Sequence, residues 1–128
     1  MTDQIRRTSP PPTGPDPRRA LGQRGEEMAA QWYADNGYQV VVTNWRCRDG
    51  EIDLIVRRAR LFVFCEVKTR NSTTFGAPVE AVTRTKQMRL RRLAARWLQE
   101  DCPVHPSGVR FDVVSILRGG LEVTEGAF

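Results

Sequence analysis

Residues 61–68 are the part of the sequence that most restricts the fold. Both alternating sets of side chains in this segment are apolar for most of its length, and Phe62 and Phe64 belong to one of these sets. A strand that is apolar on both faces is typical of the middle of a sheet that is covered on both sides. The set that contains the two phenylalanines continues into Glu66 and Lys68. The segment therefore predicts a buried central strand that ends in charged side chains.

The flanking patterns predict the layers around this strand. Apolar residues recur at helical spacing in residues 20–36 and in about 83–99. Alternating or β-branched segments predict strands at 38–42, 51–56 and 109–117, with a further short strand at 121–123. This order predicts an α/β fold in which helices cover a mixed central sheet. The expected buried stripes of the two helices are Leu21, Met28, Ala29, Trp32 and Tyr33, and Leu90, Leu93, Ala94 and Trp97.

Length and N-terminal composition predict the domain organisation. The 128 residues suffice for one domain, and the proline-rich residues 1–19 are expected to be a disordered tail before a folded domain at 20–128. No apolar run approaches the roughly 20 residues that cross a bilayer, and no apolar stretch resembles a secretory signal. We therefore expect a cytoplasmic protein without a membrane partner. Three cysteines without paired spacing and one histidine predict neither a disulfide framework nor a zinc site.

The basic residues are unevenly divided between arginine and lysine. The net charge of +5 is compatible with a phosphate-rich partner, although many basic proteins bind no nucleic acid specifically. Only Lys68 and Lys86 are lysines among the 20 basic residues. Arginine meets most needs for solvation and phosphate contact, whereas a compact charge with an adjustable pKa requires lysine. Both lysines fall within segments that the other sequence patterns single out.

A second carboxylate is expected beside the charged end of the central strand. Asp53 is on the preceding strand, on the face opposite Ile52 and Leu54, and the short link at 57–60 suggests a hairpin. Asp53 then reaches the same end of the sheet as Glu66, provided that the two side chains share a face. Two convergent carboxylates suit a hard divalent cation, and the ammonium of Lys68 would stabilise charge on a phosphate. The alternative is that Glu66 and Lys68 form a purely structural ion pair.

Helix and strand geometry add further candidates. Glu26 lies about 100° around the first helix from its buried stripe and can reach towards the sheet, whereas Glu27 points to water. Glu26 could instead interact only with the helix dipole. Glu51 shares the face of Asp53 and is a candidate on the metal or substrate side. Lys86 falls on the buried stripe of the second helix, where it either extends to solvent or contacts a substrate phosphate.

Several motifs together resemble those of the bacterial YraN family, in order and over nearly all of residues 20–117. They are the segments 22–26, 44–46, 50–55, 64–70, 75–82 and 110–114. The resemblance implies a restriction-endonuclease-like three-layer sandwich, similar to archaeal Holliday-junction resolvases. It also implies catalytic roles for Glu26, Asp53, Glu66 and Lys68, with Glu26, Asp53 and Glu66 as metal ligands. Ile52 and Cys65 depart from residues common in that superfamily, but neither departure removes a reacting group.

The leading hypothesis is a magnesium-dependent endonuclease that hydrolyses nucleic-acid phosphodiester bonds, with Mn²⁺ as an alternative ion. DNA is the expected substrate, and branched structures are among the candidates. The residues expected to contact phosphates are Arg46, Arg70, Arg84, Lys86, Arg91 and Arg92. The alternative for the helix arginines is a solvated face. The alternative for the whole chain is a catalytically silent module that binds nucleic acid or a protein partner. One site per chain would need a homodimer to cut both strands symmetrically.

Overall fold

The computed structural model describes residues 17–70 and 82–128, whose helices and strands follow the predicted order. The elements are α1 Pro17–Asp35, β1 Gln39–Cys47, β2 Gly50–Arg58, β3 Leu61–Arg70, α2 Arg84–Glu100, β4 Gly108–Leu117 and β5 Gly120–Thr124. Helix α1 begins three residues before its predicted start, and β1 continues five residues past its predicted end. The predicted disordered tail lies, up to residue 16, outside the described residues, as does most of the motif at 75–82.

The five strands form one mixed sheet in the order β1-β2-β3-β4-β5. Neighbouring strands are antiparallel except for β3 and β4, which pair in parallel from Leu61 and Gly108 to Arg70 and Leu117. Helix α2 provides the crossover that a parallel pair requires. The sequence prediction that β3 is the central strand is confirmed.

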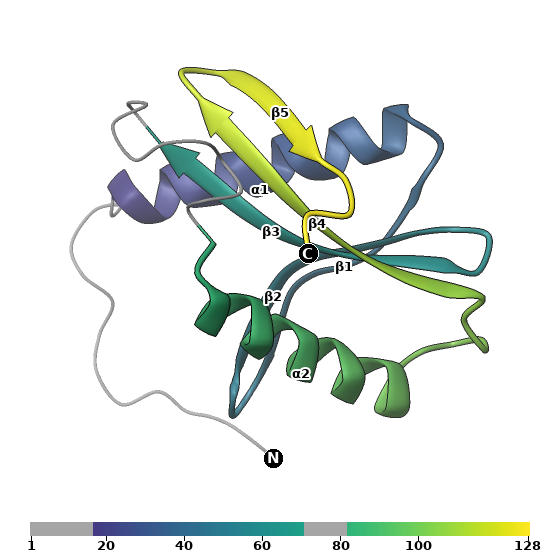
Figure 1. Cartoon of the computed structure of the whole chain (residues 1–128). Coiled ribbons are helices and arrows are strands. Elements are labelled where there is room, and N and C mark those ends of the chain that lie inside the picture. Colours follow the sequence, from purple (N-terminus) through teal and green to yellow (C-terminus); the bar gives the residue numbers. More distant parts are fainter. Residues whose placement is uncertain (1–16, 71–81) are drawn as a thin grey trace, which may run out of the picture.

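The two helices cover opposite faces of the sheet, which gives three layers (Figure 1). Beneath α1, the buried residues Ala29 and Tyr33 belong to one core cluster together with Val63 and Cys65 of β3. The cluster beneath α2 contains Leu90, Leu93, Ala94 and Trp97, with Phe62 and Phe64 of β3. The predicted three-layer α/β architecture and the predicted stripe of α2 are confirmed. No helix among the described residues is both long and apolar enough to cross a membrane.

The buried face of α1 differs from the expected stripe at Met28. Gly25, Ala29 and Tyr33 are spaced four residues apart, so they form a single ridge, and all three are buried. Met28 lies about 100° around the helix from Ala29. Its side chain is 36% exposed at the flank of the helix, and the expectation that it belongs to the core is wrong.

A second expectation fails on β2. Regular alternation predicts Ile52 and Leu54 on one face, but Leu54 packs in the cluster beneath α1 and Ile52 in the cluster beneath α2. The pairing of β2 with β3 ends at Leu54. On the other side of β2, Asn44 has a positive φ of 53°. Strand geometry is therefore interrupted on both sides of Asp53, and this irregularity lies at the candidate site.

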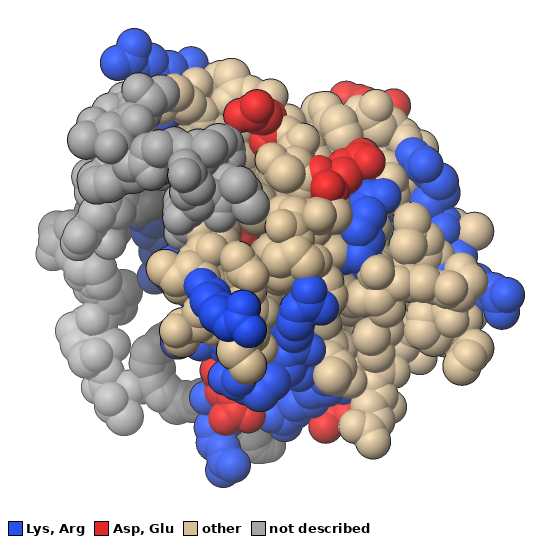
Figure 2. Space-filling view, viewed as in Figure 1, with Lys and Arg blue, Asp and Glu red and all other residues tan. Residues whose placement is uncertain are grey.

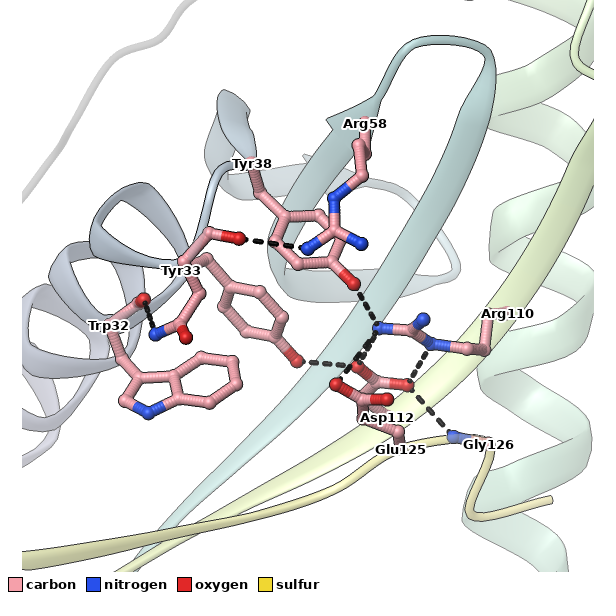
Figure 3. A network of polar contacts seen from close by, with 9 residues as sticks. Trp32, Tyr33, Tyr38, Arg58, Arg110, Asp112, Glu125 and Gly126 are labelled. Carbon is pink, nitrogen blue, oxygen red and sulfur yellow. Dashed lines mark hydrogen bonds and ion pairs between the residues drawn. The ribbon is translucent and has the colours of Figure 1, made fainter.

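A buried polar network fixes α1 to the sheet and to the C-terminal segment (Figure 3). The Asp112 carboxylate on β4 is fully buried. It accepts hydrogen bonds from the Tyr33 hydroxyl at 2.6 Å, from Arg110 Nε and Nη2 at 2.9 Å each, and from the Gly126 amide at 3.0 Å. The Tyr38 hydroxyl accepts a further bond from Arg110 at 3.0 Å. Because these donors satisfy a buried charge, the network constrains how α1 sits on the sheet.

Glycine substitutions in α1 test how closely this helix approaches the sheet. Gly25→Ala should destabilise the fold by about 1–3 kcal/mol, because its Cβ would overlap Thr69 Oγ1 and lie 3.2 Å from Ile116 Cδ1. Gly22→Ala is the matched control, since no described atom lies within 4 Å of its Cβ. Alanine is better than glycine in a helix by about 1 kcal/mol. Urea unfolding should therefore move the two midpoints in opposite directions. Equal midpoints would contradict the close approach.

Candidate active-site cleft

The site begins where β2 and β3 separate. Their pairing stops at Leu54 and Cys65, one step before Asp53 and Glu66 would face each other. Beyond that point the Val67 amide donates to Asp53 Oδ2 at 2.8 Å. The Asp53 side chain thus replaces the backbone acceptor that a continuing ladder would supply, while β3 goes on pairing with β4. This fork holds the two carboxylates at one end of the sheet.

A cleft of about 610 Å³ opens at the fork, between the β1–β2 hairpin, the end of β3 and α2. Its lining includes the three residues that sequence analysis placed together, Asp53, Glu66 and Lys68. The remaining charged residues that line it are Arg46, Arg48, Glu51, Lys86 and Arg89. Five cationic side chains and three carboxylates therefore share one cavity.

Glu66 and Lys68 form an ion pair in this cleft, as their spacing on one strand face predicts. Lys68 Nζ lies 3.1 Å from Glu66 Oε2, and the two side chains are 24% and 21% exposed. Burial opposes the charge of Lys68, but its pKa is raised overall, and the adjacent Glu66 carboxylate favours the charged form. Contact with the Lys68 ammonium lowers the pKa of Lys86. The chain's two lysines thus meet in the same cleft from β3 and α2.

The surroundings of Asp53 disfavour its charged form. Burial, followed by the negative charge of Glu66, raises its pKa to about 7, although the Val67 amide partly opposes this shift. Glu26 and Glu51 contribute smaller repulsions in the same direction. Without a bound metal ion, the Asp53 carboxyl therefore takes up a proton near neutral pH.

Glu26 faces this group from α1, but it has a different partner. Its Oε1 accepts a hydrogen bond of 2.7 Å from Asn44 Nδ2, at the positive-φ position of β1. Burial raises the pKa of Glu26, which the Asn44 bond partly offsets. In the described residues no three acidic, histidine or cysteine side chains are close enough together to hold one metal ion. The expected three-carboxylate ligand set is therefore not assembled there.

Asp53 and Glu66 alone fit a magnesium ion, because this ion needs only one or two carboxylate ligands from the protein. Mg²⁺ commonly keeps several waters and is held by one or two carboxylates together with substrate phosphates. Asp53 and Glu66 supply two such carboxylates in a cleft that also contains excess positive charge. Burial and then repulsion from Glu66 raise the pKa of Asp53, and a bound cation would offset the repulsion between the two carboxylates.

Only some of the residues that are expected to contact phosphates line the cleft. Arg46 and Lys86 line it, and Arg92 lines an adjacent hollow. Arg84 lines neither cavity, and Arg70 lines a separate cavity beside α1.

The Arg91 side chain of α2 lies outside both the cleft and the adjacent hollow. Its guanidinium stacks over the rings of Phe111 and Phe128, with its Cζ atom 4.8 and 5.6 Å from the two ring centres. The predicted contact of Arg91 with phosphate stays a prediction, and it would lie on a different side of α2 from Arg92. Adjacent helix residues point about 100° apart, and the aromatic pair holds Arg91 on its own side.

Sequence reasoning missed Arg48, Arg89 and Asn44. Arg89 follows Lys86 by three residues, so helical spacing places both on one face of α2. This signal was available in the sequence. The contact between Asn44 and Glu26 depends on an irregular backbone and had no comparable signal, apart from the tolerance of asparagine for positive φ.

The raised pKa of Asp53 predicts a pH-dependent effect of Asp53→Asn. The folded state binds this proton with a pKa of about 7 against an ordinary value of 3.8, so wild-type stability falls as the pH rises between these values. In chelator, Asp53→Asn should be more stable than wild type near pH 8, by a few kcal/mol at about 1.4 kcal/mol per pKa unit. The advantage should shrink towards about pH 4.

Urea unfolding across this pH range measures the difference between the two proteins. Asp35→Asn, which removes an exposed carboxylate at the end of α1 and outside the cleft, is the matched control. A constant stability difference between Asp53→Asn and wild type would contradict the raised pKa.

Comparison with known proteins assigns the chain to a family without a known function. Residues 25–116 match the model of the uncharacterised protein family UPF0102. A UPF0102 protein of Beutenbergia cavernae is 56% identical over 99 residues, which cover 77% of this chain and 83% of the relative. One from Streptomyces griseus is 50% identical over 112 residues, covering 86% of this chain and 94% of the relative. The matched region includes Glu26, Asp53, Glu66 and Lys68. The chain belongs to the uncharacterised protein family UPF0102.

Proposed function

We propose that this chain is a metal-dependent endonuclease that hydrolyses phosphodiester bonds in nucleic acid, with DNA as the expected substrate. The observation that carries the proposal is the fork between β2 and β3. It places Asp53 and Glu66 together in a cleft where Lys68 and Lys86 also meet. Carboxylates and lysines in this arrangement are complementary to a divalent cation and a phosphate.

The carboxylates of Asp53 and Glu66 would hold Mg²⁺, and Mn²⁺ suits the same oxygen ligands. When bound, the ion activates water and neutralises charge on the phosphate. The Val67 amide orients the Asp53 carboxylate, so this ligand is positioned before any substrate arrives. Glu26, held by Asn44, raises the pKa of Asp53 through its charge and so increases the need for a cation.

Lys68 and Lys86 would act on the phosphate. The Lys68 ammonium is held by Glu66 at 3.1 Å, which fixes its position at the end of β3. It would donate hydrogen bonds to non-bridging oxygens, where charge increases during hydrolysis. Lys86, from α2, would contact the same phosphate from the other side of the cleft. An anion between two neighbouring ammonium groups also relieves their mutual repulsion.

The resemblance of the sequence motifs to the YraN family and to Holliday-junction resolvases supports the same proposal and adds branched DNA to the candidate substrates. Two observations favour a second function. Lys68 is already paired with Glu66, and no three-ligand metal group is present in the described residues. A protein that binds nucleic acid through this cleft without cleaving it would show both features.

A cleavage assay separates the two functions. Labelled four-way junction, flap, linear duplex and single-stranded DNA are incubated with Mg²⁺ or Mn²⁺ and wild-type protein. We expect metal-dependent cleavage that falls by about 100-fold or more in Glu66→Gln or Lys68→Ala, as is typical when a group that stabilises the transition state is lost. Glu27→Gln, an exposed carboxylate next to Glu26, is the matched control and should cleave like wild type.

Metal binding has a readout that is independent of cleavage. Mg²⁺ should raise the melting temperature of wild type at about pH 8, because it binds the folded state and offsets the repulsion between the ionised carboxylates of Asp53 and Glu66. The increase should disappear in Asp53→Asn. Substrate binding without cleavage, together with no thermal response to either metal ion, would establish the non-catalytic function instead.

A further inference from the structure

A second, smaller hollow lies beside the cleft along α2. It has a volume of about 240 Å³ and is lined by three arginines of α2, Arg89, Arg92 and Arg96, with Leu93 and Asp49. Arg89 and Leu93 also line the main cleft, so the two cavities share a wall. Within the described residues neither Arg89 nor Arg92 is paired with a carboxylate.

These arginines extend the row that begins with Lys86. Lys86, Arg89, Arg92 and Arg96 follow one another at steps of three or four residues, which places them along one side of α2. Ten residues of helix span about 15 Å. Successive phosphates of a B-form strand are about 3.4 Å apart along the axis, so this row is longer than a single phosphate contact requires. Figure 2 shows Lys and Arg side chains gathered over α2, with few acidic side chains among them.

The tip of the β1–β2 hairpin rests on α2 where the two cavities meet. Gly50 has a φ of 146°, and a Cβ built there would lie 3.3 Å from Leu93 Cδ1 and 3.5 Å from Arg89 Cδ. Next to it, Asp49 Oδ2 lies 3.3 Å from Arg96 Nη1. Both side chains of this pair are well exposed, at 69% for Asp49 and 41% for Arg96.

We propose that this second hollow binds a backbone phosphate of a nucleic-acid strand whose scissile phosphate lies in the main cleft. Asp49 then occupies Arg96 as a substitute anion while no strand is bound. This inference rests on the proposed nucleic-acid substrate. A guanidinium binds carboxylate and phosphate oxygens with the same paired donors. An exposed ion pair contributes only about 0–1 kcal/mol, so a phosphate that also contacts Arg89 and Arg92 can displace Asp49.

Two opposite mutational effects follow from this arrangement. Removing the substitute anion with Asp49→Asn should strengthen binding several-fold, because the strand then competes at Arg96 only with Glu100, whose Oε2 lies 3.3 Å from Arg96 Nε. Arg92→Ala should weaken binding and reduce the slope of log Kd against log salt concentration by about one, the value for one lost phosphate contact. A role of Asp49 limited to holding the hairpin predicts weaker binding in Asp49→Asn, with a less ordered cleft.

The experiment measures fluorescence anisotropy of labelled single-stranded and duplex DNA in chelator, over a series of KCl concentrations. Binding in chelator separates phosphate contacts from cleavage. Matched controls carry the same charge changes at exposed positions that line neither cavity: Asp35→Asn for Asp49→Asn, and Arg60→Ala for Arg92→Ala. Thermal melting confirms that each variant folds.

The outcomes distinguish this inference from the proposed function. Tighter binding by Asp49→Asn and a shallower salt slope for Arg92→Ala, with unchanged controls, establish the second phosphate site. If wild type binds and cleaves DNA while these variants bind like their controls, the second site is overturned and the nuclease remains. If wild type binds no DNA at low salt, both proposals fail.

Discussion

The hydrogen bond from the Val67 amide to the Asp53 carboxylate is the interaction on which the candidate site depends. It lies where β2 stops pairing with β3, and it satisfies an amide that the sheet no longer pairs. A buried amide without a partner costs about 1–3 kcal/mol, so the side chain stabilises the fork as well as forming part of the cleft. The same bond orients Asp53 towards Glu66. The strands can separate at this point because β3 keeps its second neighbour, β4, along its whole length.

Charge in the cleft is arranged in two opposed groups. Burial, together with repulsion among carboxylates from α1, β2 and β3, raises the pKa of Asp53, while two lysines from β3 and α2 also repel one another. The Glu66–Lys68 pair links the groups but neutralises only one charge of each. A divalent cation bound to a phosphate carries the complementary charges, and this match supports the proposed phosphodiester hydrolysis. The arginine row of α2 continues the positive charge away from the cleft, in the direction that a bound strand would follow.

Local patterns predicted the framework because their physical causes are local. A segment that is apolar on both faces must be covered on both sides, which identified β3, and helical spacing identified the stripe of α2 correctly. The errors arose where one element constrains another. Met28 is exposed because the ridge from Gly25 to Tyr33, rather than the average apolar direction, faces the sheet. Ile52 and Leu54 face opposite sides because strand geometry is interrupted at Asp53, which lies between them. The stacking of Arg91 on two aromatic rings from the C-terminal part of the chain is a contact between elements that local spacing does not predict.

The sequence by itself determined the layers, the central strand and the identity of the chemical groups, because each depends on residue type and spacing within one segment. It also determined that Glu66 and Lys68 stand side by side, since two residues on one strand must share a face. Only the tertiary structure decided that Asp53 reaches them, because this requires the two strands to part. Tertiary structure also decided that Glu26 accepts a hydrogen bond from Asn44, and that Lys86 meets Lys68. These contacts join elements far apart in the chain, and their geometry depends on packing and backbone irregularities that residue spacing does not encode.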